Sequence, residues 1–154
     1  MTKLDIECFY NIIGDNMRTF YIFKIKKHFA ILTKNNPYNL YKTIEKIYYL
    51  DEEELKKTTN VFEYLKDNIN NDELNNIIYC NYRDKSYYTK FLNTHMINDY
   101  FTNEKTKLIV NKKYLLLRTN EEVPLFFKDI EKNEKNLFVC DFLNKDYFWL
   151  EKIV

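Results

Sequence analysis

The sequence predicts an α+β fold in a single domain, with a mainly antiparallel sheet formed by the N-terminal strand and C-terminal strands. Near the start, the aromatic-rich run at residues 19–25 favours a strand. At the end, residues 137–142 and 147–150 flank the polar break 144–146, which is typical of a hairpin. Between these ends lies a helical segment. We therefore expect both ends of the chain to meet in one sheet, with the helical middle packed on it.

Helical patterns dominate the segment that follows the opening strand. Asn36 and Pro37 are typical of a helix start, with Asn as the N-cap and Pro at the first helical position. The acidic run 51–54 suits the positive end of the next helix. The expected helices cover residues 26–34 and 37–50. A further helical stretch opens at residue 51 and continues its apolar face to Ile69. After a break at residues 70–72, a short helix covers residues 73–79.

Strand patterns return in the second half of the chain. A break of hairpin length at residues 111–113 separates two apolar runs, which predicts a pair of strands. The expected elements are strands at residues 91–97, 107–110 and 114–117, and a helix that the segment 121–124 opens and that runs to about residue 131.

A chain of 154 residues fits one domain with a buried core. We expect residues 1–16 to be an N-terminal extension, which could form a short helix or could precede the true initiator Met17. Residues 17–154 then form the domain. Acidic residues interrupt the start too early for a signal peptide, and no run approaches the ~18 apolar residues of a membrane span.

Composition excludes several classes of function. A net charge of +1 singles out neither a nucleic acid nor a membrane. The basic residues are nearly all Lys, which disfavours sequence-specific reading of DNA. Three widely spaced cysteines indicate reduced thiols and a cytoplasmic protein. With a single Gly, a phosphate-binding loop or dinucleotide fingerprint is not expected.

Few residues suggest catalysis or metal binding. His28 and His95 could combine with Cys80 or Cys140, but their spacing matches no metal-ligand pattern, and we expect Cys140 to be an inert residue of a buried strand. Asp141 alternates with its apolar neighbours and is expected to point outward near a turn. A hydrolase would require a pocket that joins Asp141 with a histidine.

The aromatic residues of the first strand leave two possibilities open. Tyr21 and Phe23 alternate with Phe20 and Ile22, so one face of this strand could be exposed. Exposed sheet aromatics stack on bases in RNA-binding modules, which gives single-stranded nucleic-acid binding as an alternative function. The commoner outcome is that all four residues belong to the core. Tyr is also enriched in protein–protein interfaces.

Three segments share an ordered pattern with a known family. Residues 20–30 form an aromatic-rich strand that leads through Ile-Lys and two polar residues to Phe-Ala at a helix start. Residues 127–149 carry a Phe-Phe helix, an apolar strand that ends in Asp141-Phe142, a polar turn with Asn144-Lys145, and Trp149. The strand with residues 95–97 fits between them in order. Over roughly residues 20–150, the chain resembles the sporulation inhibitor of replication (SirA) family of Firmicutes.

The resemblance implies a small protein without enzymatic activity, and the residues lead us to expect no cofactor or metal. Family members bind the N-terminal domain of the replication initiator DnaA and suppress replication during sporulation. For this chain we expect no direct contact with nucleic acid or membrane. Their binding surface involves the first helix, and Phe29 matches its aromatic residue by position. Residues 33–36 depart from the aromatic and Gly-Arg-Glu-like stretch of the family. The partner-binding residues so implied are Phe29 and its neighbours Lys26, Lys27, Ala30, Thr33 and Lys34.

Overall fold

The structure is a computed structural model that describes residues 16–154. Over these residues the fold is α+β in one domain, as predicted. The short helix considered for the N-terminal extension lies outside the described residues. The boundary between residues 16 and 17 stays a prediction.

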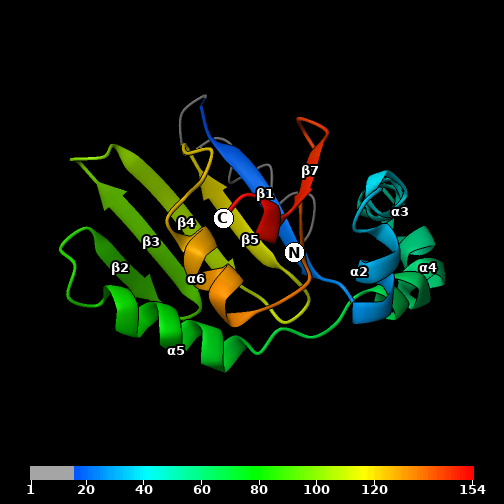
Figure 1. Cartoon of the computed structure of the whole chain (residues 1–154), viewed down its shortest axis with the longest axis horizontal. Helices are drawn as coiled ribbons and strands as arrows, with labels where there is room; N and C mark the ends of the chain where they lie inside the picture. Colours follow the sequence, from blue (N-terminus) through cyan, green and yellow to red (C-terminus); the bar gives the residue numbers. More distant parts are fainter. Residues whose placement is uncertain (1–15) are drawn as a thin grey trace.

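In the described part of the chain, seven strands form one antiparallel sheet in the order β2-β3-β4-β5-β1-β6-β7 (Figure 1). The strands span Arg18–Lys24 (β1), Tyr88–Phe91 (β2), Thr94–Asp99 (β3), Glu104–Val110 (β4), Leu115–Thr119 (β5), Leu137–Asp141 (β6) and Asp146–Trp149 (β7). Tyr21 of β1 lies opposite Leu116 of β5 and Cys140 of β6. The prediction that both ends of the chain meet in one sheet is therefore confirmed.

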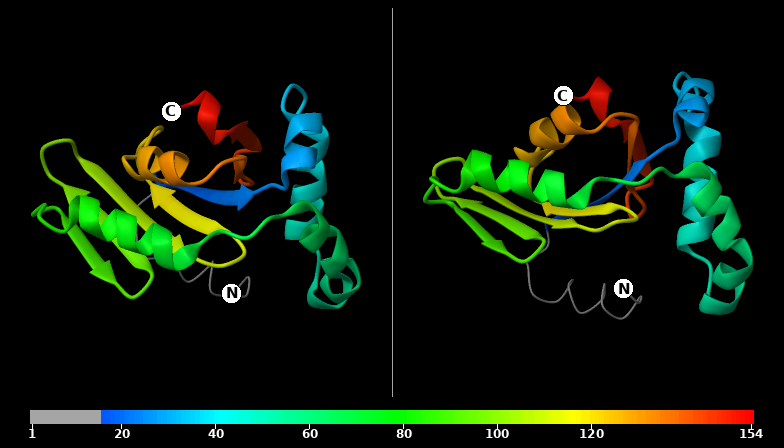
Figure 2. Two further views of the ribbon diagram at one scale, coloured as in Figure 1. Left: turned by 60° about the horizontal axis from the view of Figure 1, so that its bottom comes forward. Right: turned by 90° about the horizontal axis from the view of Figure 1, so that it is seen from below.

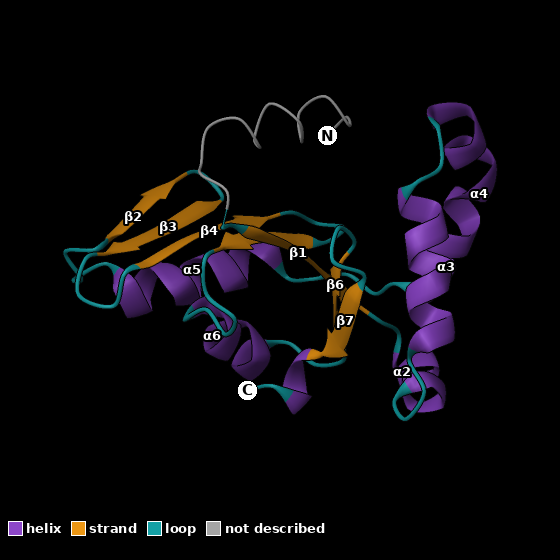
Figure 3. Ribbon diagram, turned by 90° about the horizontal axis from the view of Figure 1, so that it is seen from above, coloured by secondary structure: helices purple, strands orange, loops and turns teal. Residues whose placement is uncertain are grey.

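The helices form two groups around this sheet. They span Lys27–Thr33 (α2), Tyr38–Tyr48 (α3), Glu52–Leu65 (α4), Asn71–Tyr82 (α5) and Phe126–Asn133 (α6), and a 3-10 turn, η1, covers Leu150–Lys152. Helices α5 and α6 lie across one face of the sheet (Figure 2). Helices α2, α3 and α4 stand together at the end where β6 and β7 lie (Figure 3).

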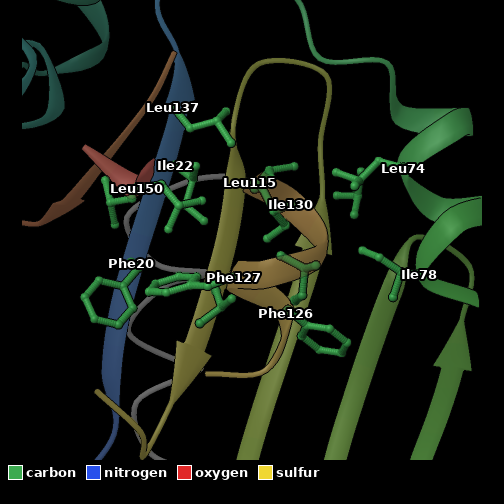
Figure 4. Packing of buried hydrophobic residues seen from close by; sticks show 14 of the residues in the cluster. Phe20, Ile22, Leu74, Ile78, Leu115, Phe126, Phe127, Ile130, Leu137 and Leu150 are labelled. Atoms are coloured by element: carbon green, nitrogen blue, oxygen red, sulfur yellow. The ribbon is translucent and has the colours of Figure 1, made fainter. Parts of the chain in front are cut away.

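One core cluster fills the space between the sheet and the helices α5 and α6 (Figure 4). Phe20 and Ile22 of β1 are fully buried there, because alternate residues of a strand point to the same face. The ring of Phe20 lies 5.5 Å from that of Phe127 on α6. The helices contribute Leu74, Ile78, Phe126, Phe127 and Ile130, and η1 contributes Leu150.

A second core cluster lies on the opposite face, beneath α2 and α3. Tyr21 and Phe23 are its β1 members and are buried. Aromatic rings dominate the contact with α3: Tyr48 stacks on Phe142 at 4.2 Å, and Tyr41 stacks on Tyr147 at 4.4 Å. The helical middle of the chain therefore packs on both faces of the sheet, with α5 across one face and α2 to α4 at the β1, β6 and β7 end of the other.

The predicted strand at residues 91–97 is wrong, because a hairpin turn interrupts it. Phe91 ends β2 and pairs with Thr94, which begins β3, so Leu92 and Asn93 form a two-residue loop. Leu92 has a φ angle of 51°, a conformation that usually takes Gly in such loops. The chain has one Gly, at another position, so the usual sequence signal of this turn is missing.

The predicted helix limits also needed correction. Helix α4 ends at Leu65, and Ile69 lies beyond it in a connecting segment, where it is buried without being helical. Helix α5 begins at Asn71, earlier than predicted, because the side chain of Asn70 caps it by accepting the Glu73 N–H. Helix α3 begins at Tyr38, with Pro37 rather than Asn36 in the cap position.

Replacing Phe20 with Ala should lower the free energy of unfolding by about 3–5 kcal/mol, because a large cavity would open between β1 and α6. Urea denaturation monitored by circular dichroism measures this change. The matched control is Phe91→Ala, whose ring is 70% exposed and whose loss should change stability by no more than about 0.5 kcal/mol. Equal effects of the two substitutions would contradict the burial of Phe20 between β1 and α6.

Candidate protein-binding surface

Helix α2 follows β1 directly, and its start is tied to the end of α4. The Lys26 N–H donates to the carbonyl oxygen of Leu65 at 3.0 Å, and the Asp67 N–H donates to that of Lys24 at 2.7 Å. A helix of seven residues does not persist alone in water. These backbone bonds therefore fix where α2 begins and hold it beside α4.

The residues of α2 divide into an inner and an outer face. Ala30 is 2% exposed and packs into the second core cluster. Ile31 and Leu32 are 65% and 77% exposed, and Lys27 and His28 are exposed beside them. We call these four residues the α2 face. Two large aliphatic side chains on the solvent side of so short a helix mark a surface that a partner can cover.

Phe29 lies at the edge of the α2 face and connects it to α4. Its ring contacts that of Tyr64 edge-on at 5.3 Å, and Tyr64 is 64% exposed. The Lys26 ammonium lies 5.6 Å from the centre of the Tyr64 ring. Because Phe29 and Leu32 are three residues apart, they are neighbours on the helix surface. Phe29, Leu32 and Tyr64 thus form an apolar surface on two helices, and the exposed Ile31 lies on the other side of Leu32; we call these four residues the α2–α4 patch.

The residues that the resemblance implied for partner binding do not all lie at this surface. Lys26, Lys27 and Phe29 are at least partly exposed, whereas Ala30 is in the interior, where its side chain cannot meet a partner. The Thr33 hydroxyl donates to the Phe29 carbonyl oxygen at 2.7 Å. At the C-terminal end of α2, the Lys34 ammonium lies 2.6 Å from the carboxylate of Glu151, so this charge is already engaged within the chain.

Sequence reasoning missed the outward direction of Ile31 and Leu32 and the contribution of Tyr64. A signal for the first was present, because four successive apolar residues from Phe29 to Leu32 cannot all face inward on a helix. Tyr64 carried no such signal. Tyr64 lies beside Phe29 because the end of α4 is attached to the end of β1, and this is a tertiary contact.

The expectation that Asp141 points to solvent is wrong. Its side chain is buried, and Oδ2 accepts a hydrogen bond from Arg18 Nε at 2.9 Å. Asn144 donates two further hydrogen bonds to the Asp141 carboxylate, from its backbone N–H at 3.2 Å and from its side-chain amide at 2.6 Å. A carboxylate can be buried when a guanidinium and N–H groups satisfy it. Asp141 therefore braces the β6–β7 turn against β1.

His95 is buried in a different network on the α5 side of the sheet. Its Nε2 contacts Asn75 Oδ1 at 2.7 Å, and its Nδ1 contacts the Tyr88 hydroxyl at 2.7 Å. Because Asn75 Oδ1 can only accept, Nε2 carries the proton and Nδ1 accepts from Tyr88. Burial, with a smaller contribution from Lys90, lowers the pKa of His95 to about 4. These contacts do not include Asp141, so the pocket that a hydrolase would need is not formed by this pair.

The other residues considered for binding or chemistry, Tyr21, Phe23 and Cys140, belong to the second core cluster. Tyr21 and Phe23 are 6% and 5% exposed, so the hypothesis that they stack on bases is wrong. Cys140 is buried, as expected, and burial raises the pKa of its thiol. Within residues 16–154, no three His, Cys, Asp or Glu side chains are grouped so as to hold a metal ion. Over the same residues, no helix has the length and apolar character needed to cross a membrane.

Comparison with known protein families identifies the chain. Residues 18–154 match the family model of the sporulation inhibitor of replication protein SirA. The chain belongs to the SirA family. The match spans most of the chain and runs from the first residue of β1 to the C-terminus, so it includes both sheet faces and the α2–α4 patch. No curated protein gives a significant match to this SirA-family chain.

Membership of the SirA family indicates a regulatory role in the inhibition of replication. The resemblance that the sequence showed is therefore confirmed as family membership. The α2–α4 patch is an exposed apolar area with basic residues at its edge.

Acidification from pH 7 to pH 5 should lower the free energy of unfolding of this SirA-family protein by about 2 kcal/mol through His95 alone. The pKa of His95 is near 4 when folded and 6.5 when unfolded, so the unfolded chain binds more protons over this range and gains stability relative to the folded chain. Urea titrations at several pH values measure the slope. Replacing His95 with Gln should remove most of it, and an unchanged slope would contradict the assignment.

Proposed function

We propose that this protein inhibits the initiation of chromosome replication by binding the N-terminal domain of the replication initiator DnaA through the α2–α4 patch. Family membership supports the inhibitory role. The observation that carries the choice of surface is the exposure of Ile31 and Leu32, at 65% and 77%, with Leu32 next to the Phe29–Tyr64 pair on the helix surface. In such a complex these side chains lose their contact with water.

The patch has the composition of a small binding hot spot. Burying Ile31 and Leu32 contributes about 1.5–3 kcal/mol each, and the two aromatic rings add flat apolar area with few rotamers to immobilise. Phe29 and Tyr64 already contact each other, so part of the surface is ordered before binding. Inhibition then requires only that the occupied surface of DnaA becomes inaccessible, and no chemical step is involved.

Lys26 and Lys27 provide a basic edge to the patch. Lys27 is exposed, and Lys26 lies over the ring of Tyr64. Charges at the rim of an interface steer the approach of an oppositely charged partner more than they add to its final affinity. We therefore expect the surface of DnaA that meets α2 to be acidic around an apolar centre.

The alternative function, binding of single-stranded nucleic acid, lacks the aromatic platform on which it depended, because Tyr21 and Phe23 belong to the core. Titration with labelled oligonucleotides at two salt concentrations distinguishes the two functions. A nucleic-acid binder would show strong salt dependence, whereas the proposed interaction needs the DnaA domain.

Replacing Leu32 with Ala should weaken binding to the N-terminal domain of DnaA by about tenfold or more, because an exposed anchor is removed without touching the core. Phe29→Ala should weaken it further, since it also removes the support of Tyr64. Isothermal titration calorimetry with the full chain measures both. The control is Leu92→Ala, in which a side chain with the similar exposure of 73% is removed from the β2–β3 loop.

Equal affinity of the wild type and the Leu32→Ala and Phe29→Ala variants would mean that DnaA is bound elsewhere on the molecule. Absence of binding by the wild-type chain would reject DnaA as the partner while leaving the family assignment intact.

Reversing the charge of Lys27 with a Glu should slow association with the DnaA domain several-fold at low salt and leave dissociation nearly unchanged. Stopped-flow kinetics at two salt concentrations separate the rates, and the difference should shrink as salt rises. Lys113→Glu is the control, because it makes the same change in net charge at an exposed position in the β4–β5 turn. If both variants slow association equally, only net charge matters and the rim has no specific role.

A further inference from the structure

The side of β2, β3 and β4 that faces away from α5 is open in the described part of the chain. Helices α5 and α6 lie across the other side, and α2, α3 and α4 stand at the end of the sheet where β6 and β7 lie (Figures 2 and 3). No helix of residues 16–154 crosses the open side. We call it the open face, and with the neighbouring part of β5 it carries Phe91, Met96, Lys107, Ile109, Leu116 and Arg118.

The strand register places an apolar row on the open face. Residues directly opposite each other in adjacent strands point to the same side of a sheet. The row runs through successive pairs, from β2 to β5, as Phe91, Thr94, Ile109 and Leu116. Leu116 is in turn opposite Tyr21, which belongs to the second core cluster. The open face therefore extends this cluster, yet Phe91 at its outer end is 70% exposed.

A basic pair lies in the next row of the open face. Met96 of β3 is opposite Lys107 of β4, and Lys107 is opposite Arg118 of β5. Like charges placed directly opposite each other on a sheet repel. Arg118 is 5% exposed, and a buried guanidinium is stable only where acceptors satisfy it. A carboxylate beside this pair lowers the repulsion and supplies such acceptors.

Within the described strands β2 to β5, no carboxylate points to this side. Asp99 of β3 and Glu104 of β4 alternate with residues of the open face, so they point to the side of α5. Glu121 and Glu122 lie beyond the end of β5. The open face thus favours an occupant that brings apolar and acidic side chains together. A second copy of the chain fits poorly, because a twofold interface would bring the basic pairs of both copies together.

The segment of residues 1–15 leads directly to the open face. The described chain begins at Asn16, just before β1, and Thr19 of β1 lies opposite Arg118. The segment therefore joins the sheet at the row of the basic pair. It also precedes the family match, which begins at Arg18, so it is an addition to the part of the chain that the family defines.

The sequence of this segment suits the open face in length and composition. Four apolar residues have the spacing of one side of a helix, namely Ile6, Phe9, Tyr10 and Ile13. Gly14 follows them and is typical of a helix end. Residues 4–13 span ~15 Å as a helix. The four neighbouring strands β1, β5, β4 and β3 lie across ~14 Å. A helix of this length therefore reaches across the open face.

We propose that residues 4–13 form a helix that packs on the open face, across β3, β4 and β5. Asp5 and Glu7 flank Ile6, so they lie on the two edges of the apolar side and pair with Lys107 and Arg118. The helix covers the second side of the sheet and shields its apolar row from unwanted association. The α2–α4 patch lies at the other end of the sheet and stays accessible, so the proposal does not depend on the partner that binds α2.

Oxidation of Met96 by hydrogen peroxide in the full chain tests the proposal, because Met96 lies on the open face and its sulfur reacts where solvent reaches it. Mass spectrometry of the peptide that contains Met96 gives the rate. In the wild type we expect this rate to be several-fold lower than that of free methionine. The variant Ile6→Ser, Phe9→Ser weakens the apolar side of the helix and should raise the rate several-fold.

The matched control is Leu4→Ser, Cys8→Ser, which changes the opposite side of the same helix and should leave the rate at Met96 unchanged. A synthetic peptide of residues 1–15, added to the Ile6→Ser, Phe9→Ser variant, should restore slow oxidation, whereas a peptide with the same two substitutions should not. The substituted residues precede β1 and both core clusters, and circular dichroism will show that each variant folds.

Equal oxidation rates in the wild type and the Ile6→Ser, Phe9→Ser variant would overturn the proposal. An equal acceleration in the Leu4→Ser, Cys8→Ser control would do the same, because the side of the helix would then not matter. Slow oxidation of the wild type that becomes fast on dilution would show that a second copy, rather than residues 4–13, covers the open face.

Discussion

The insertion of β1 between β5 and β6 is the constraint on which the rest of the structure depends. Without β1, the remaining strands would form two separate sheets, one of β2 to β5 and one of β6 and β7. Both of its neighbours lie about a hundred residues later in the chain, so long loops must close before these pairs form. The hydrogen bond between Arg18 and Asp141 also holds β1 in this position, because it connects the start of β1 to the end of β6.

The position of α2 follows from the insertion of β1 between β5 and β6. β1 supplies alternate side chains to both core clusters, and its last residues lead directly into α2. The backbone bonds from Lys26 to Leu65 and from Asp67 to Lys24 then attach the end of β1 to the end of α4. Since a seven-residue helix has little stability of its own, these contacts hold it with Ala30 inward and Leu32 outward. The strand that joins the two parts of the sheet therefore also determines which residues of α2 face solvent.

Much of the fold was predictable, because the terminal strands have strong local patterns and the helices have regular apolar spacing. What failed depended on information that is absent from local sequence. The loop at Leu92 uses a conformation normally taken by Gly, so the pattern of residues 91–97 indicated one strand in place of two. The alternation of residues 140–142 predicts a solvent-facing Asp141, because its partner, Arg18, is 123 residues away and leaves no local signal. For the candidate site, Phe29 and the neighbouring lysines could be inferred from the family resemblance, whereas Tyr64 became visible only through its contact across two helices.

The distribution of aromatic residues separates folding from recognition in this protein. Most of the large aromatic side chains of the sheet are buried, where rings such as Phe20 and Trp149 stabilise one arrangement of strands. Tyr64, Tyr100 and Phe101 are exposed, and their removal leaves both core clusters intact. The elements that carry them belong to the core packing, but these three side chains do not. A sequence can therefore change its recognition residues while it keeps the family fold, and for this reason membership of the family alone does not determine the partner.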